Sequence, residues 1–410
     1  MWGLLCCLLL LQSDEVSLQE LQALTQPAPS DERTLRALVE QTLPRVAKVM
    51  RSSPPKAVVT KVLTRSQASR KLRAVLDREY PNHRLSRLGA ALQAIHLLEP
   101  EVDLEREAVA LYAANVGGFY DPHEKTLYLL ADQPGVLQQL VIAHELAHAV
   151  QDEQLGLERA TRDAMRSEDA QMALSAAIEG NAQAVAAAVV AADSGGEDGL
   201  TGTLLAESTA LSASIAAESS AANPWLALQL GFPYSAGADL VRAIATKDDP
   251  AACRLLRRLP TTTAQVLDPA AYRANESALR GAIGLSSLLH AESVYETSLG
   301  EANLNLLTSI HGVARLGNGW RGDVLEVVRR QQMQSAAWAV AFREAREADA
   351  FGAFYSTLVK GSRTADAVAF AEKDGQVSAV LVRGKIAAIL IRVPRDSWRL
   401  VAEAAVQALR

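Results

Sequence analysis

The chain has 410 residues, of which 49% are hydrophobic and 21% are charged, so it is long and apolar enough to build two or three domains around a large core. Its formal net charge of −6 leaves no dominant basic field to attract phosphates, which argues against a nucleic-acid partner. No feature of the sequence points to an obligate protein partner.

The chain opens on an apolar run, residues 1–11, followed by polar residues. A run of this length suits the core of an export signal, whereas a bilayer span needs about 20 residues. The positively charged start that usually precedes such a core is missing. We expect residues 1–13 to be a leader, the protein to be exported to the periplasm, the cell envelope or the exterior, and no transmembrane span. Removal of the leader would leave Cys253 as the only cysteine, so no internal disulfide is expected.

Residues 14–100 are predicted to be a mainly helical region, with a short strand at 58–63. Within this region lies a local basic cluster, which is most simply the solvated face of a helix. The cluster consists of Arg65, Arg70, Lys71, Arg73 and Arg78.

Two short strands are predicted at 116–120 and 126–130, joined by a turn that contains His123. We therefore expect a hairpin just before the segment that carries the chemistry. The hairpin is either ordinary sheet or an edge on which an extended peptide pairs. His123 is expected to be a solvated turn residue and not a metal ligand.

The sequence His144-Glu145-Leu146-Ala147-His148 is an HExxH motif. On a helix, residues four apart share a face, so His144 and His148 can bind one zinc ion from neighbouring turns. Glu145 then lies beside the metal, where it can accept a proton from a water molecule that zinc has acidified. The apolar neighbours of the motif, and Gly156 just beyond it, are typical of a buried helix. The alternative is a pair of core histidines without a metal.

A catalytic zinc site needs a third protein ligand and one open position. The best candidate is Glu179, in a predicted helix that starts near Ser167 and stops near Asp193. A carboxylate on an apolar helix face is costly unless it is paired or bound to a metal. Gly180 indicates a close approach between helices. The alternative for Glu179 is an ordinary exposed helix residue.

Two further residues are candidates for supporting roles. Tyr234 is the first candidate for a donor to the oxyanion that forms during peptide hydrolysis, although a tyrosine beside Phe and Pro is often a core residue. His290 and His311 are weaker candidates for the same role. Asp152 is a candidate to hold an imidazole N–H of the metal site, with exposure at the helix end as the alternative.

His144 to His148 followed by Glu179-Gly180 resembles the gluzincin clan of zinc metallopeptidases, the thermolysin-like group in which a downstream helix supplies a glutamate ligand. The wider order of motifs resembles a family of bacterial, usually exported, neutral zinc metallopeptidases. These motifs are Gly118-Phe119-Tyr120-Asp121-Pro122, Leu127-Tyr128, the HELAHAVQD run, Glu179-Gly180, Phe232-Pro233-Tyr234, residues 262–269 and Gly319-Trp320-Arg321-Gly322-Asp323.

The resemblance implies that His144, His148 and Glu179 bind one Zn²⁺ ion and that a substrate peptide pairs with the strand beside the HExxH helix. The sequence departs from the family at two positions, because the family usually has an acidic residue in place of Asn181 and a histidine in place of Asp268.

Residues 182–222 are rich in Ala and Ser and are predicted to form two helices around a loop. Beyond Asp323 the pattern changes to apolar or alternating runs that predict strands, followed by a helix from Asp396. The predicted strands are 324–328, 336–342, 367–370, 377–382 and 386–391. We expect residues 323–410 to be a small α+β module packed on the catalytic part.

The sequence thus predicts an α+β protein, predominantly helical, with a zincin-like catalytic domain over residues 101–322 that contains a small sheet. The predicted function is a zinc-dependent peptidase that acts on a peptide or protein substrate, with Glu145 as general base. The alternative is a non-catalytic protein, zinc-stabilised or peptide-binding, on the same scaffold. Glu145 discriminates between them, because a purely structural site has no use for a base beside the metal.

Overall fold

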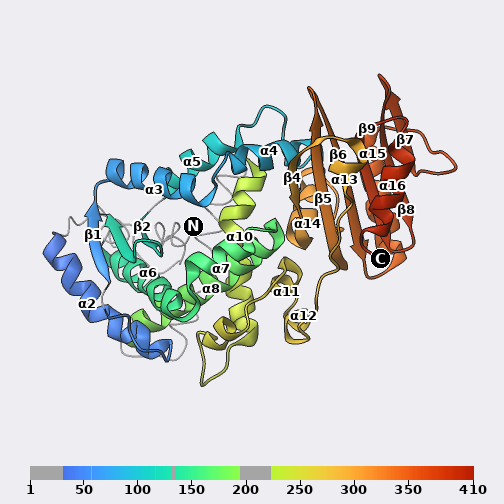
Figure 1. Ribbon diagram of the computed structural model, residues 1–410. Helices are drawn as coiled ribbons and strands as arrows, with labels where there is room; N and C mark the ends of the chain where they lie inside the picture. Colours follow the sequence, from blue (N-terminus) through green and yellow to red (C-terminus); the bar gives the residue numbers. More distant parts are fainter. Residues whose placement is uncertain (1–30, 57, 116, 131–134, 194–222) are drawn as a thin grey trace.

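The structure, a computed structural model, describes residues 31–56, 58–115, 117–130, 135–193 and 223–410. It is an α+β protein and mainly helical, as the sequence predicts. Figure 1 shows a helical part around a small sheet at one end of the molecule and a larger sheet at the other. The leader expected over residues 1–13 and the second helix expected before 222 lie outside the described residues.

The helical part runs from α2 to α12. Its elements are α2 (Glu32–Val49), β1 (Val59–Leu63), α3 (Arg65–Glu79), α4 (Arg84–Ala94), α5 (Leu104–Asn115), β2 (Gly118–Asp121), β3 (Thr126–Leu130), α6 (Gly135–Leu155), α7 (Leu157–Ala164), α8 (Glu168–Asp193), α10 (Pro224–Ile244), the 3₁₀ helix η1 (Cys253–Arg257), α11 (Thr263–Leu267) and α12 (Pro269–Arg273). The second part contains α13 (Leu285–Leu289), β4 (Glu292–Thr297), α14 (Gly300–Ile310), β5 (Trp320–Arg330), β6 (Met333–Phe342), α15 (Ala345–Val359), β7 (Ala369–Lys373), β8 (Gln376–Arg383), β9 (Ile386–Pro394) and α16 (Trp398–Gln407).

The small sheet has the strand order β1-β3-β2, with β1 parallel and β2 antiparallel to β3. The strand predicted at 58–63 and the predicted hairpin are therefore confirmed. Strand β2 forms one edge of this sheet and packs against α6. This contact brings the hairpin onto the helix that carries the HExxH motif.

Helices α6, α8 and α10 form the centre of the helical part, and α2 packs on α6 and α8. Helices α8 and α10 approach closely at two glycines. A Cβ atom on Gly180 would lie 2.3 Å from the main-chain carbonyl carbon of Gly237, and a Cβ on Gly237 would lie 2.2 Å from the carbonyl oxygen of Ala176. The close helix approach predicted from Gly180 is thus confirmed.

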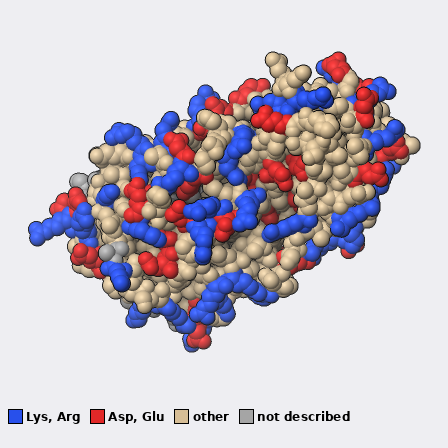
Figure 2. Space-filling view, viewed as in Figure 1, with Lys and Arg blue, Asp and Glu red and all other residues tan. Residues whose placement is uncertain are grey.

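One described helix, over Glu168–Ala192, has the length and apolar composition of a membrane span, and 83% of its most apolar window is buried inside the molecule. This burial is typical of the core helix of a globular part. On the face shown in Figure 2, Lys and Arg side chains are interspersed with Asp and Glu side chains.

The large sheet has the order β4-β5-β6-β9-β8-β7, and all of its neighbours are antiparallel. Both faces of β6 are covered, because Trp338 and Phe342 pack with α15 while Ala339 and Ala341 pack with α16. Burial on both faces explains why this strand is a continuous apolar run in the sequence.

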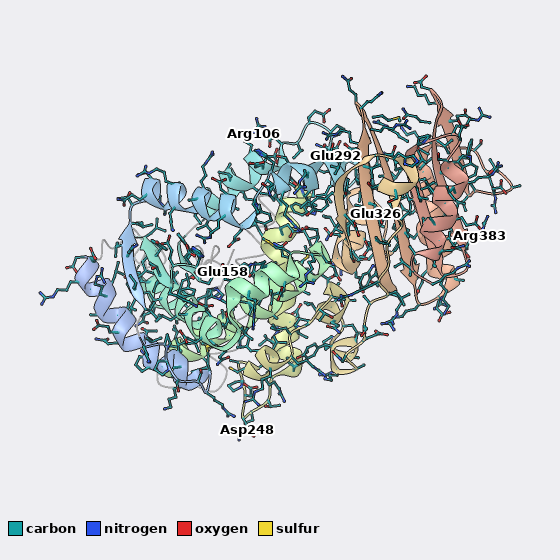
Figure 3. The ribbon with its side chains drawn as sticks, in the orientation of Figure 1. Arg106, Glu158, Asp248, Glu292, Glu326 and Arg383 are labelled. Atoms are coloured by element: carbon teal, nitrogen blue, oxygen red, sulfur yellow. The ribbon has the colours of Figure 1, made fainter. Side chains whose placement is uncertain are left out.

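The large sheet includes β4 and the start of β5, so it begins in the chain before residue 323, the start expected for the C-terminal module. Its core also takes in α4 of the helical part. Within the sheet, the buried carboxylate of Glu326 (Figure 3) accepts main-chain N–H bonds from Ile283 and Leu285 at 2.6 Å, and from Gly284 at 3.0 Å. These bonds stabilise its charge and join α13 to β5.

Candidate metal centre

Helix α6 presents the HExxH motif toward α8, and the residues on both sides of the motif are buried. The helix ends where Gly156 adopts a positive φ of 64° and its N–H bonds to the carbonyl oxygen of Asp152 at 2.8 Å. This stop is the one predicted from the glycine. In the sequence, Asp132 as a possible N-cap and Pro134 in the first turn predict the start of this helix, and both lie outside the described residues.

His144, His148 and Glu179 meet at one point between α6 and α8. Nε2 of His144 lies 3.0 Å from Oε2 of Glu179 and 3.0 Å from Nε2 of His148, which in turn lies 3.6 Å from Oε2 of Glu179. Two ligand atoms at about 2.0 to 2.1 Å from a tetrahedral zinc ion are about 3.3 to 3.4 Å apart. The three side chains therefore have the spacing of ligands to a single ion, and they are the one such group of His, Cys, Asp or Glu among the described residues.

The side chains of this cluster are buried: both histidines are 0% exposed and Glu179 is 2% exposed. Burial lowers the pKa of His144, because the charged imidazolium is poorly solvated there. Burial alone would raise the pKa of Glu179, but the two imidazoles outweigh it and hold the carboxyl well below its usual range. A neutral imidazole and an ionised carboxylate are the forms that bind a metal.

Glu145 lies next to the cluster and is held by the hairpin. Its Oε2 accepts the main-chain N–H of Tyr120 at 2.9 Å, and its buried Oε1 has no hydrogen-bond partner among the described residues. Burial and the charge of Glu179 raise the pKa of Glu145 well above its usual range. A buried carboxylate oxygen without a partner is costly, and a cation with a bound water molecule beside it would remove that cost.

The hairpin is fixed by two ion pairs from α3. Asp121, at the end of β2, is buried and pairs with Arg78 at 2.8 Å and with Lys71 at 3.3 Å. The basic cluster is therefore not only a solvated helix face, because two of its members neutralise a buried carboxylate. The pairs fix the strand whose Tyr120 N–H holds Glu145.

Asp152 does not have the role that we expected. Its Oδ2 accepts from the phenol of Tyr120 at 2.9 Å and pairs with Lys125, and its Oδ1 accepts the main-chain N–H of Leu157 at 2.9 Å. It is also buried, so the exposed alternative is wrong as well. The expected contact with an imidazole is made instead by Gln151, whose Oε1 lies 2.7 Å from Nδ1 of His148.

Of the donor candidates, only Tyr234 lies at the centre. Its ring is stacked on that of His144, with 6.2 Å between the ring centroids. His290 is exposed at the end of α13, and Nε2 of His311 lies 3.0 Å from the carbonyl oxygen of His96. His123 is half exposed, as expected for a turn residue.

The two positions that depart from the resembled family have different surroundings. Asn181 is fully buried on α8, near the cluster, and bonds to Gln151. Asp268 is exposed and caps α12 through the N–H of Ala270 at 2.8 Å. The motif at residues 262–269 has a structural contact. The main-chain N–H and the hydroxyl of Thr263 both donate to Oδ1 of Asp169 at the start of α8.

Residues 56–222 match the model of the family described as "Putative metallopeptidase family (DUF6782)". The matched stretch runs from β1 to beyond α8, so it includes Glu145 and all three candidate ligands and ends before Tyr234. No curated protein and no solved structure shows a significant match to the chain. The family match supports a metallopeptidase, and His144, His148 and Glu179 are the residues that could hold its metal.

Proposed function

We propose that this protein is a zinc-dependent peptidase with its active site between α6 and α8. The observation that carries the proposal is the convergence of His144, His148 and Glu179. Beside them lies Oε1 of Glu145, for which the described part of the chain offers no hydrogen-bond partner. Two imidazoles and one carboxylate are the protein ligands of many catalytic zinc sites, in which the fourth position remains open. A site with only a structural role would favour a fourth protein ligand.

When bound, zinc supplies a Lewis acid that lowers the pKa of a water ligand and polarises the substrate carbonyl. Glu145 is the general base in this proposal: its Oε1 takes the proton from the attacking water as the new C–O bond forms. The same proton then passes to the amide nitrogen as the C–N bond breaks, which leaves a carboxylic acid and an amine. The bond from Tyr120 N–H keeps Oε2 in place, so that Oε1 faces the reacting atoms.

We also propose that the substrate is a peptide or protein that pairs along β2. The proposal is supported by the place of this strand, which is at the edge of its sheet and packs on α6, the helix with the HExxH motif. Main-chain pairing gives affinity with little sequence selectivity. The net charge of −6 and the intermixed charges on the face shown in Figure 2 support our proposal that nucleic acid is not a partner.

Tyr234 is proposed to donate a hydrogen bond from its phenol to the oxyanion, because its ring lies over that of His144. We expect Tyr234→Phe to lower kcat by about 10²- to 10³-fold, as loss of one oxyanion donor does, with zinc content and KM little changed. Steady-state kinetics measure kcat and KM, and metal analysis measures the zinc content. A variant that keeps full kcat would assign Tyr234 to packing alone.

The function is tested with the purified chain at neutral pH on unfolded casein and a quenched-peptide library. We expect cleavage that stops when a chelator removes the metal and returns when zinc is added. The burial of the whole centre favours one alternative, a zinc-stabilised protein without turnover. That alternative gains if the chain holds one zinc ion per molecule and cleaves neither substrate.

A further inference from the structure

A chain of hydrogen bonds joins His148 to two main-chain carbonyl groups. Oε1 of Gln151 lies 2.7 Å from Nδ1 of His148, and Nε2 of Gln151 donates to the carbonyl oxygen of Ile178 at 3.0 Å and to Oδ1 of Asn181 at 2.9 Å. Asn181 in turn donates through Nδ2 to the carbonyl oxygen of Ala251 at 2.8 Å. Both amide side chains are 0% exposed, so water does not compete for these bonds.

The two carbonyl groups determine the direction of every bond in the chain. A carbonyl oxygen only accepts, so Ala251 requires the NH₂ group of Asn181 to face it, which turns Oδ1 toward Gln151. Ile178 and this Oδ1 together require the NH₂ group of Gln151, which turns Oε1 toward His148. An amide oxygen is also only an acceptor, so Nδ1 of His148 must carry the proton.

We propose that Gln151 and Asn181 are positioning residues that hold His148 as the tautomer with its lone pair on Nε2, aimed at the metal position. This inference rests on the proposed zinc site. A metal-bound histidine usually donates its second N–H to a carboxylate, a carbonyl or water, and this bond fixes both the tautomer and the orientation of the ring. Here a side-chain amide accepts that bond, and a second amide orients the first.

The use of amides has a consequence for the charge of the site. Glu145 and Glu179 together carry two negative charges when ionised, which balance one Zn²⁺ ion in a buried centre. A carboxylate in place of Gln151 or Asn181 would add a charge that the buried site does not compensate. The resembled family usually has an acidic residue at the position of Asn181. Asn181 still supports His148, because it orients Gln151, and Gln151 accepts the N–H of His148.

The test measures the zinc dissociation constant by competition with a chromophoric chelator, and the melting temperature of each metal-free variant. We expect Gln151→Leu to raise the zinc Kd by about 10- to 100-fold, the usual loss when such a supporting contact is removed. Gln183→Leu is the matched control, because Gln183 is a buried amide on α8 that takes no part in this chain of bonds. Its zinc Kd should equal that of the wild type.

Gln151→Glu separates positioning from general stability. The new carboxylate still accepts from Nδ1 of His148, so zinc should bind no more weakly than in the wild type. It cannot donate to Ile178 or Asn181, and its charge is not compensated when the metal is absent, so the melting temperature of the metal-free protein should fall. A wild-type Kd in folded Gln151→Leu, or a Kd in Gln151→Glu as weak as in Gln151→Leu, would overturn the proposal.

The readout does not depend on turnover, so a chain that binds zinc but cleaves no peptide still tests this inference, and a chain that binds no zinc refutes the metal site itself. If Gln151→Leu does not fold, ¹⁵N-histidine NMR of the metal-free wild type at pH 8 decides. The proton of His148 should be on Nδ1. A proton on Nε2 would contradict the proposed role of Gln151.

Discussion

Replacement of Glu145 by glutamine is expected to abolish peptide cleavage while zinc remains bound. Glutamine has nearly the same shape and keeps an oxygen that can accept the Tyr120 N–H, so folding and the three ligands are preserved. The variant lacks the carboxylate that takes the proton from water and returns it to the leaving amine. General-base assistance contributes about 10²- to 10⁴-fold in rate, and two proton transfers use this residue, so the loss should reach the upper end of that range.

Glu153→Gln is the matched control for this experiment. Glu153 is exposed on the same helix, and its replacement removes the same charge without touching the centre. Its kcat/KM should match that of the wild type. If Glu145→Gln loses its zinc, then Glu145 is a ligand and the assignment of the three ligands is wrong. If it keeps its activity, another group is the base.

Substitution of any one of the three candidate ligands is expected to remove most of the bound metal. Purified protein should contain about one zinc ion per chain, and His144→Ala, His148→Ala and Glu179→Ala should each lower the occupancy. The loss of affinity should exceed the about 10- to 100-fold that follows the loss of a supporting contact, because a direct bond to the ion is removed. Metal analysis after dialysis measures the occupancy.

His290→Ala serves as the control, because His290 is exposed just after α13 and lies outside the cluster. Its zinc content should be unchanged. Glu179→Ala is the most informative variant, because Glu179 comes from a different helix than the two histidines. Full zinc retention in this variant would leave the third ligand unassigned among the described residues.

Much of the fold follows from local patterns in the sequence. The hairpin, the helix that carries the HExxH motif, the helix that carries Glu179 and the later strands all lie where hydrophobic periodicity and turn residues predict them. Such patterns are local, because a helix or a strand needs only the right face buried and the right residues at its ends. The way these elements pair in a sheet depends on contacts between distant segments. Strand β4 lies before residue 323 and pairs with β5 at the edge of the large sheet, and the sequence did not predict it.

By itself the sequence identified the candidate ligands. The spacing of His144 and His148 places both on one face of a helix, and a carboxylate such as Glu179 on an apolar helix face is costly unless it is paired or bound to a metal. Only the tertiary structure decided what surrounds them. The sequence made Asp152 a candidate to hold an imidazole, with exposure as the alternative. In the structure Asp152 accepts from the phenol of Tyr120 in the hairpin, and Gln151, one residue earlier on the helix, contacts His148. The bond from Tyr120 to Glu145 uses a main-chain N–H, which carries no signal in the sequence. Spacing along a helix determines which residues share a face. The partner of each polar group depends on which other segment packs against that face. That segment is determined only by the tertiary fold.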